Sequence, residues 1–182
     1  MRVIPTSLPD LLVIESPVYS DARGSFTNVF HAKEFAAAGL PVTFAQDSHS
    51  RTVQHGLRGM HYQLDAPQGK LVRAITGTVF DVVVDLRRDS PSFTRWVGVT
   101  LSAGDGRQLW IPPGFAHGFL VLSEAADMGY KLTRAYDPAS ERTLAWNDAT
   151  VAIEWPLPAG VTPILSVKDA AGAHLPDADV YV

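Results

Sequence analysis

The chain has 182 residues and no cysteine, so disulfides and thiolate metal sites are excluded. Hydrophobic residues make up 46% of the sequence and charged residues 19%, a composition typical of a globular chain with a substantial core and not of a disordered one. The net charge of -4 argues against a nucleic-acid-binding protein, whose domain would usually be basic.

The sequence shows no sign of membrane insertion or of division into several domains. Its first residues lack the long apolar run of a secretory signal, and no apolar run is long enough to span a bilayer. No linker, repeat or low-complexity segment interrupts it. We therefore expect a soluble, cytoplasmic protein in which residues 1–182 form a single domain.

Short strand-like segments with turn residues between them dominate the chain. The best helix candidate is the Ala-rich segment 31–39, which ends at Gly39. The tail after Trp155 is rich in Pro, Ala and Gly and is expected to pack as loops. Many short strands are typical of an all-β sandwich or barrel. In chain order, strands are predicted at residues 11–14, 25–30, 44–50, 56–63, 70–75, 78–86, 94–101, 108–111, 119–122 and 128–134.

The stretch at residues 56–63, GLRGMHYQ, and the lysine that follows it at position 70 combine charge with strand-like sequence. Arg58, His61 and Lys70 lie among apolar residues, where polar groups of this kind are unusual. Since side chains alternate along a strand, His61 and Gln63 should share one face. Gly59 is expected to bend the strand and redirect Arg58. A base and a cation that face one cavity are what proton abstraction next to a carbonyl requires.

One segment resembles a motif of small β-barrels of the cupin kind. Gly106, the PPG at 112–114 and His117 follow the spacing of the second cupin motif, although Val121 replaces its usual asparagine. The first motif should offer two histidines and a glutamate, but only His61 is present there. Two histidines are fewer than the ligands of a stable transition-metal site, and the nearby Lys70 would repel a cation. A metal-free site is therefore predicted, with metal-dependent cupin chemistry as an alternative.

Further segments, in order over most of the chain, resemble the dTDP-4-dehydrorhamnose 3,5-epimerase family. A single AHGF, as at 116–119, would be weak, but the ordered series is specific. The resemblance implies a cupin-like antiparallel β-barrel, or jelly roll, with few short helices. It also implies a homodimer that acts on a dTDP-sugar without a cofactor. The matching segments are residues 56–63, 68–73, 80–87, 107–122, 146–148 and 166–171.

The resemblance also implies a reaction and a set of catalytic residues. The family inverts C3 and C5 of a dTDP-linked 4-keto-6-deoxyhexose, turning dTDP-4-dehydro-6-deoxyglucose into dTDP-4-dehydrorhamnose. Removing a proton beside the ketone leaves an enolate that must be stabilised, and returning the proton to the opposite face inverts the carbon. By resemblance, His61 is the base, Tyr130 the acid on the opposite face, and Lys70 the cation near the oxyanion. Asp169 resembles the carboxylate that orients the histidine.

Six further positions resemble contacts to the nucleotide sugar. Arginines suit the diphosphate because of their planar fork, and the aromatic residues are expected to pack against the base or the sugar. In the family, residues near the start of the chain reach the partner's site. These six positions are Arg23, Phe26, Gln46, Arg58, His117 and Tyr136.

Some questions stay open at this level. Asn28 and Ser48 stand where the family usually has glutamate and asparagine, which leaves the nucleotide and the sugar undecided. An enzyme that inverts C3 or C5 alone, or a non-catalytic barrel that binds a nucleotide sugar, are alternatives. Taken singly, His61 and Tyr130 would more often be structural, and it is their occurrence in family order that favours catalysis.

Overall fold

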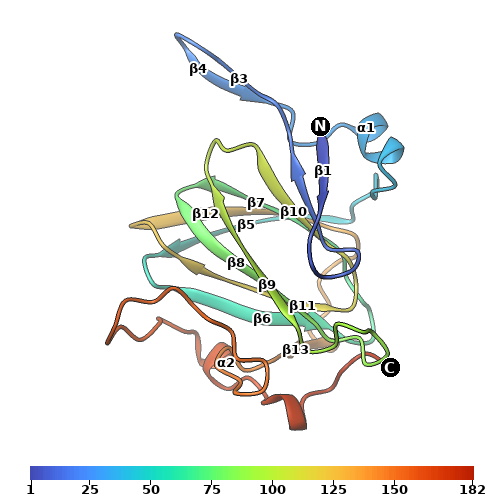
Figure 1. The fold of residues 1–182 in the computed structure, drawn as a ribbon, viewed down its shortest axis with the longest axis vertical. Helices are drawn as coiled ribbons and strands as arrows, with labels where there is room; N and C mark the ends of the chain where they lie inside the picture. Colours follow the sequence, from blue (N-terminus) through green and yellow to red (C-terminus); the bar gives the residue numbers. More distant parts are fainter.

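The computed structural model describes residues 1–182 as two antiparallel sheets and a projecting hairpin (Figure 1). The larger sheet consists, in spatial order, of β1 (Arg2–Pro5), β2 (Leu12–Glu15), β10 (Arg107–Ile111), β7 (Lys70–Thr76), β12 (Ala125–Leu132) and β5 (Gln46–Val53). The smaller sheet consists of β13 (Glu141–Thr143), β6 (Leu57–Gln63), β11 (Phe115–Val121), β8 (Thr78–Asp85) and β9 (Trp96–Ser102). The hairpin is formed by β3 (Val18–Asp21) and β4 (Gly24–Thr27).

Helices are few and short, as predicted. They are α1 (Ala32–Ala37), α2 (Val167–Ala170) and the 3-10 helix η1 (Leu175–Asp177). None of them has the length and the apolar character that crossing a bilayer would take. The tail after Trp155 is mostly loop, as expected, but it also carries α2 and η1.

The expected all-β antiparallel barrel is confirmed, and each of the ten predicted strands overlaps an observed one. Three strands were not predicted, β1, β3 and β13, which have only three or four residues each. The strand predicted at residues 44–50 is longer in the structure, where residues 51–53 continue β5 to Val53. Pairing with β12 holds this stretch extended, with Arg51 opposite Asp127.

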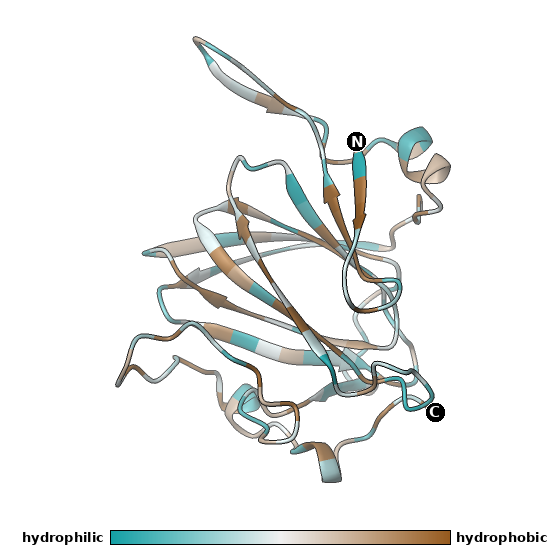
Figure 2. Ribbon diagram, viewed as in Figure 1, coloured by the Kyte–Doolittle hydropathy of each residue, from teal (hydrophilic) through white to brown (hydrophobic).

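The main core lies between the two sheets. Fourteen buried residues form this cluster, including Val72, Leu109 and Met128 of the larger sheet and Val83 and Phe119 of the smaller one. Brown, apolar stretches run along strands of both sheets in Figure 2. Burying this apolar surface supplies most of the stabilisation of such a sandwich.

Two further clusters cover the outer faces of the sheets. On the smaller sheet, Met60, Tyr62 and Val82 pack against the C-terminal tail through Trp155 and Tyr181. On the larger sheet, residues of β2, β7 and β10 pack against Phe35 of α1 and Leu40. The Tyr62 side chain thus belongs to the outer cluster, where its hydroxyl donates to the Asp179 carbonyl oxygen of the tail, as the alternation along the strand predicted.

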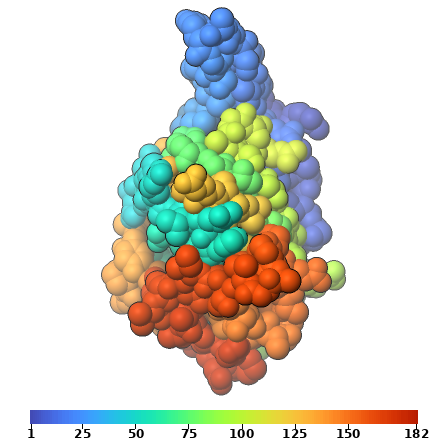
Figure 3. Space-filling view, turned by 90° about the vertical axis from the view of Figure 1, so that its left-hand side faces the viewer, coloured from blue at the N-terminus to red at the C-terminus, as the bar shows by residue number.

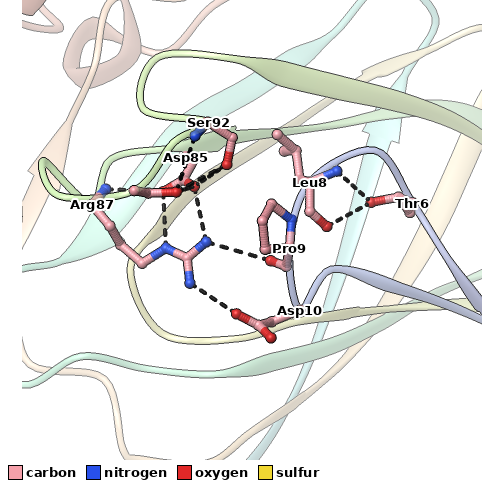
Figure 4. Close-up of polar contacts among 8 residues, drawn as sticks. Thr6, Leu8, Pro9, Asp10, Asp85, Arg87 and Ser92 are labelled. Carbon is pink, nitrogen blue, oxygen red and sulfur yellow. Dashed lines mark hydrogen bonds and ion pairs between the residues drawn. The ribbon is translucent and has the colours of Figure 1, made fainter.

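A polar network ties the loop between β1 and β2 to the end of β8 (Figure 4). The Arg87 guanidinium donates to the buried Asp85 carboxylate at 2.9 and 3.0 Å, and its Nη1 lies 3.0 Å from Asp10 Oδ2. Ser92 Oγ donates to Asp85 Oδ2 at 2.7 Å. Because several donors surround it, the Asp85 charge is tolerated in the interior.

Strand β6 contains an irregularity that matters for the site. Between its pairs with β11, His61 to His117 and Arg58 to Phe119, β6 advances three residues and β11 only two. The extra residue lies at Gly59, whose φ of +127° only glycine adopts easily. Without the bulge, Arg58 and His61 would point to opposite faces, whereas here both line one cavity. The prediction that Gly59 redirects Arg58 is therefore confirmed.

Gly118 of β11 makes this bulge sterically feasible, and its replacement should be costly. A Cβ there would lie 2.6 Å from the Arg58 carbonyl oxygen, so the backbone would have to move. We expect Gly118→Ala to lower the free energy of unfolding by about 1–3 kcal/mol, measured by denaturant titration. Gly129→Ala is the matched control, because its Cβ would meet only side chains, those of Ile75 at 3.1 Å and Arg73 at 3.9 Å. Equal stability of the two variants would contradict the tight packing of β6 on β11.

Candidate active site

A cavity of about 320 Å³ opens between the two sheets. Its walls come from β5, β7 and β12 on one side and β6, β11 and β13 on the other. This volume is in the range of small-molecule binding sites. The cavity brings together seven of the ten residues predicted as site residues, namely Gln46, Arg58, His61, Lys70, His117, Tyr130 and Tyr136.

His61 and Asp169 form a hydrogen-bonded pair at the wall of this cavity. His61 Nε2 lies 2.6 Å from Asp169 Oδ1, although the two residues are 108 positions apart. Asp169 belongs to α2, whose first turn is capped by Ser166 Oγ accepting from the Asp169 backbone N–H at 3.1 Å. The cap and the tail packing bring the carboxylate to the histidine, which leaves Nδ1 as the free nitrogen of a neutral ring.

The surroundings set the protonation state of this pair. Burial lowers the pKa of His61 below its usual 6.5, and the hydrogen bond to Asp169 only partly opposes that effect. Burial by itself would raise the pKa of Asp169, but hydrogen bonds from His61, the Gly59 N–H and Ser166 lower it overall. Near neutral pH the pair is therefore a neutral imidazole beside a carboxylate, which is a proton acceptor.

Lys70 begins β7 and places an ammonium in the same cavity. Its Nζ donates to the His61 carbonyl oxygen at 3.1 Å and keeps further donors available for a ligand. Burial lowers the pKa of Lys70 to about 8, while the negative charges of Asp81 and Glu141 favour the protonated form. The group is thus a cation at neutral pH, but it loses its proton as the pH rises above about 8.

Tyr130 approaches the cavity from β12 in the opposite sheet. Its ring packs against the main core and forms an edge contact with the His117 ring at 6.5 Å between centroids. Burial raises the pKa of Tyr130 to about 12. The phenol is therefore protonated at neutral pH and is a potential proton donor on the wall opposite His61.

Several polar residues around the cavity were not among the predicted site residues. Asp81 is fully buried and holds His117 Nε2 at 3.0 Å from both carboxylate oxygens. Ser50 Oγ lies 2.9 Å from the Tyr130 hydroxyl. Asp81 lies within a segment that resembles the family, and a lone acidic residue in a run of valines was the signal that could have revealed it.

A second polar group lies at the rim of the cavity. The Tyr136 hydroxyl donates to Glu141 at 2.8 Å, and the Lys168 ammonium donates to the same carboxylate at 2.8 Å. Gln46 Oε1 accepts from the Tyr136 backbone N–H at 2.8 Å. Tyr136 is half exposed there, so one face of its ring is free for a ligand.

Arg23 and Phe26 lie away from the cavity, on the β3–β4 hairpin. The hairpin projects from the body of the molecule, as the blue extension at the top of Figure 3 shows. The Arg23 side chain is 90% exposed and pairs with Asp21, and Phe26 is 63% exposed. Within one chain, these two residues are not brought to the other predicted site residues.

No three or more His, Asp or Glu side chains gather in a geometry able to hold a metal ion. Of the two histidines weighed as ligands, His61 is bound to Asp169 and His117 to Asp81. The prediction that the reaction needs no cofactor stays a prediction at this point.

Comparison with known proteins agrees with the geometry. A family model described as dTDP-4-dehydrorhamnose 3,5-epimerase matches residues 5–177. A protein of that name from Shigella flexneri is 50% identical over 184 residues, covering 100% of both chains. Another of that name, from Pseudomonas aeruginosa, is 50% identical over 182 residues and covers 100% of this chain and 99% of its own.

Solved structures show the same relationship. The dTDP-6-deoxy-D-glucose-3,5-epimerase RmlC from Legionella pneumophila, in complex with dTDP-4-keto-L-rhamnose, has a TM-score of 0.92 and 47% identity, covering 98% of this chain and 94% of its own. The 3'-monoepimerase ChmJ from Streptomyces bikiniensis, in complex with dTDP-quinovose, has a TM-score of 0.89 and 30% identity, covering 95% and 87%. On this sequence and structural similarity, the chain belongs to the dTDP-4-dehydrorhamnose 3,5-epimerase family of isomerases.

Proposed function

We propose that the protein is a cofactor-independent epimerase that inverts C3 and C5 of a dTDP-linked 4-keto-6-deoxyhexose, converting dTDP-4-dehydro-6-deoxyglucose to dTDP-4-dehydrorhamnose. The observation that carries this proposal is the His61–Asp169 pair on the wall of a cavity that also holds Lys70 and Tyr130. Family membership supplies the class of substrate. A location in the cytoplasm, as expected from the sequence, belongs to the same proposal.

The base in this mechanism is His61. Its free Nδ1 takes the proton from the carbon next to the C4 ketone, and the electron pair of the C–H bond moves into the enolate. The carboxylate of Asp169 stabilises the imidazolium that forms, because it lies 2.6 Å from the other ring nitrogen. A carboxylate that fixes the tautomer also keeps the basic nitrogen turned toward the substrate.

Lys70 and Tyr130 complete the reaction. The ammonium of Lys70 stabilises the negative charge that develops on the C4 oxygen, and it does so strongly because burial of the ammonium weakens screening by solvent. Tyr130, on the opposite wall, then donates its phenolic proton to the other face of the enolate carbon, which inverts it. One such cycle at each carbon beside the ketone gives the doubly inverted sugar.

Recognition of the nucleotide is assigned to the rim of the cavity. Arg58 is exposed there, and its Nε is engaged with Thr52 while part of the guanidinium stays free for a diphosphate oxygen. His117 lies deeper, fixed by Asp81. Tyr136, oriented by Glu141, offers a ring face on which a base can stack, and Gln46 lies beside it.

The protein is proposed to act as a homodimer in which the β3–β4 hairpin reaches the partner's cavity. The hairpin exposes Tyr19 and Phe26, each 63% accessible, on a projection that extends away from the two sheets. Apolar surface on an extended hairpin favours burial against another protein. In this arrangement Arg23 and Phe26 contribute to a site whose catalytic groups belong to the other subunit.

An epimerase of a single centre is the second candidate. The observation that favours it is the similarity to ChmJ, a 3'-monoepimerase whose TM-score to this chain is 0.89. The acid–base arrangement described above serves one inversion as well as two, since each uses the same chemistry at a different carbon.

Labelling in heavy water tests the proposal. Incubation of wild-type protein with dTDP-4-keto-6-deoxyglucose in D₂O should place deuterium at C3 and C5, and a chelator should leave the rate unchanged. His61→Ala should reduce labelling by roughly 100-fold or more because it removes the base. Label at one carbon alone would identify the single-centre enzyme. Binding without labelling at either carbon would mean a non-catalytic nucleotide-sugar-binding protein.

The pH dependence of kcat/KM should be bell-shaped. Activity should fall as pH drops through the lowered pKa of His61, below 6.5, because the base must be unprotonated. It should also fall as pH rises through about 8, because Lys70 must be a cation. Lys70→Arg, which keeps its charge, should abolish the alkaline limb even if its maximal rate is lower. An alkaline limb that stays near 8 in that variant would show that another group is responsible.

Subunit complementation tests the composite site. Arg23→Ala and His61→Ala homodimers should each be weakened, the first by about 10- to 100-fold in kcat/KM through loss of a charged contact. Mixed dimers, purified with two different affinity tags, contain one site with an intact His61 and an intact Arg23 from the partner. They should therefore recover up to about half of the wild-type activity. Mixed dimers as inactive as the parents would contradict a site shared between subunits.

A further inference from the structure

The inward face of β5 is polar along its whole length, which is unusual for a strand that faces the interior of a barrel. Exposure alternates along the strand, with Asp47, His49, Arg51 and Val53 exposed and the residues between them half buried. These inward residues are Gln46, Ser48, Ser50 and Thr52. Since an inward position at the edge of a core usually holds an apolar residue, this strand forms a polar wall for the cavity and not a part of the core.

Ser50 is the member of this wall that contacts a catalytic group. Its Oγ lies 2.9 Å from the Tyr130 hydroxyl. Neither hydroxyl has another hydrogen-bond partner within the chain. By contrast, Ser48 is directed to Gln46, whose Nε2 donates to Ser48 Oγ at 2.9 Å. Ser50 is thus the one polar group that can fix the hydroxyl of Tyr130.

The rest of the Tyr130 ring is held by packing. It lies against the main core cluster and makes an edge contact with the His117 ring. With the ring fixed, the remaining freedom of the phenol is the direction of its O–H bond. If Ser50 donates to the phenolic oxygen, the phenolic hydrogen is free to point into the cavity.

Proton donation leaves a negative charge on the phenolic oxygen of Tyr130, and this charge must be stabilised. Burial raises the pKa of Tyr130 to about 12, so the phenolate left after donation is unfavourable in this environment. The negative charge of Asp81 adds to this effect, whereas the hydrogen bond with Ser50 and the positive charge of Arg58 oppose it. A hydrogen bond to a charged oxygen is stronger than one to a neutral oxygen, so it stabilises the product of the transfer more than the starting phenol.

We propose that Ser50 is a positioning residue for the acid of this reaction: it turns the Tyr130 hydroxyl toward the bound sugar and donates its own hydrogen bond to the phenolate oxygen. This inference rests on the proposed epimerase function. In the step itself, the O–H bond of Tyr130 breaks, a C–H bond forms at the enolate carbon, and the electron pair stays on the phenolate oxygen. Ser50 keeps its proton throughout.

Exchange and inversion should then respond differently to loss of the Ser50 hydroxyl. His61 takes a proton from the substrate and, after exchange with D₂O, can return a deuteron to the same face. This exchange with retention does not use Tyr130. Removing the Ser50 hydroxyl should therefore lower the rate of inversion by about 10- to 100-fold, the effect of one hydrogen bond to a charged oxygen, and leave exchange with retention in place.

The test compares two variants of equal shape. Ser50→Val removes the hydroxyl, whereas Ser50→Thr keeps it, so any packing effect of the extra methyl group is common to both. NMR of the dTDP-4-keto-sugar in D₂O gives the ratio of inversion to exchange with retention. We expect a 10- to 100-fold lower ratio for Ser50→Val and a ratio within a few-fold of wild type for Ser50→Thr. Ser48→Ala, on the same face, should preserve the ratio even if substrate binding weakens.

A double variant shows whether Ser50 acts through Tyr130. Tyr130→Phe should lower inversion strongly, and adding Ser50→Val should then have no further effect on the ratio. A full additional loss in the double variant, or equal ratios in Ser50→Val and wild type, would overturn the assignment of Ser50. Absence of any exchange in wild-type protein would instead overturn the proposed epimerase, and this inference with it.

Discussion

The hydrogen bond between His61 and Asp169 is the interaction on which the rest of the site depends. It joins a barrel strand to the C-terminal tail, and the carboxylate is only 4% exposed. A buried charge is costly unless donors surround it, and here the donors are the imidazole and the Gly59 N–H. The tail can therefore place this charge only when it packs on the outer face of the smaller sheet. Formation of the base is thus coupled to completion of the fold.

The bulge in β6 is the second constraint. A regular strand would turn Arg58 and His61 to opposite faces, but the extra residue at Gly59 lets both line the same cavity. Gly118 on the neighbouring strand provides the space, because a Cβ at that position would collide with the Arg58 carbonyl. Two glycines on adjacent strands thus let one segment supply both a base and a cation for an anionic ligand.

One physical cause, burial, sets all three reacting groups to their neutral-pH roles. It lowers the pKa of His61, lowers that of Lys70 to about 8 and raises that of Tyr130 to about 12. In each case the charged form is disfavoured, so the imidazole is free to accept a proton and the phenol keeps one to give. The Lys70 ammonium survives because the negative charges of Asp81 and Glu141 lie near it. Acid and base can therefore coexist across one small cavity at the same pH.

The sequence by itself determined the fold class, most of the strands and many of the groups that meet at the cavity. Strand periodicity and turn residues are local properties, and His61 and Lys70 lie close together in a segment whose charges are out of place on a strand. The short strands β1, β3 and β13 were missed because none of them buries a residue fully, so their sequences carry no clear apolar pattern. The partners of Ser50 and Asp81 were also hidden, since the packing of the strands decides that Ser50 meets Tyr130 and Asp81 meets His117. Only the tertiary structure decided which distant residues meet. The contacts of Asp169 with His61 and of Ser50 with Tyr130 span 108 and 80 positions, and such contacts follow from how sheets and tail pack, not from the local sequence.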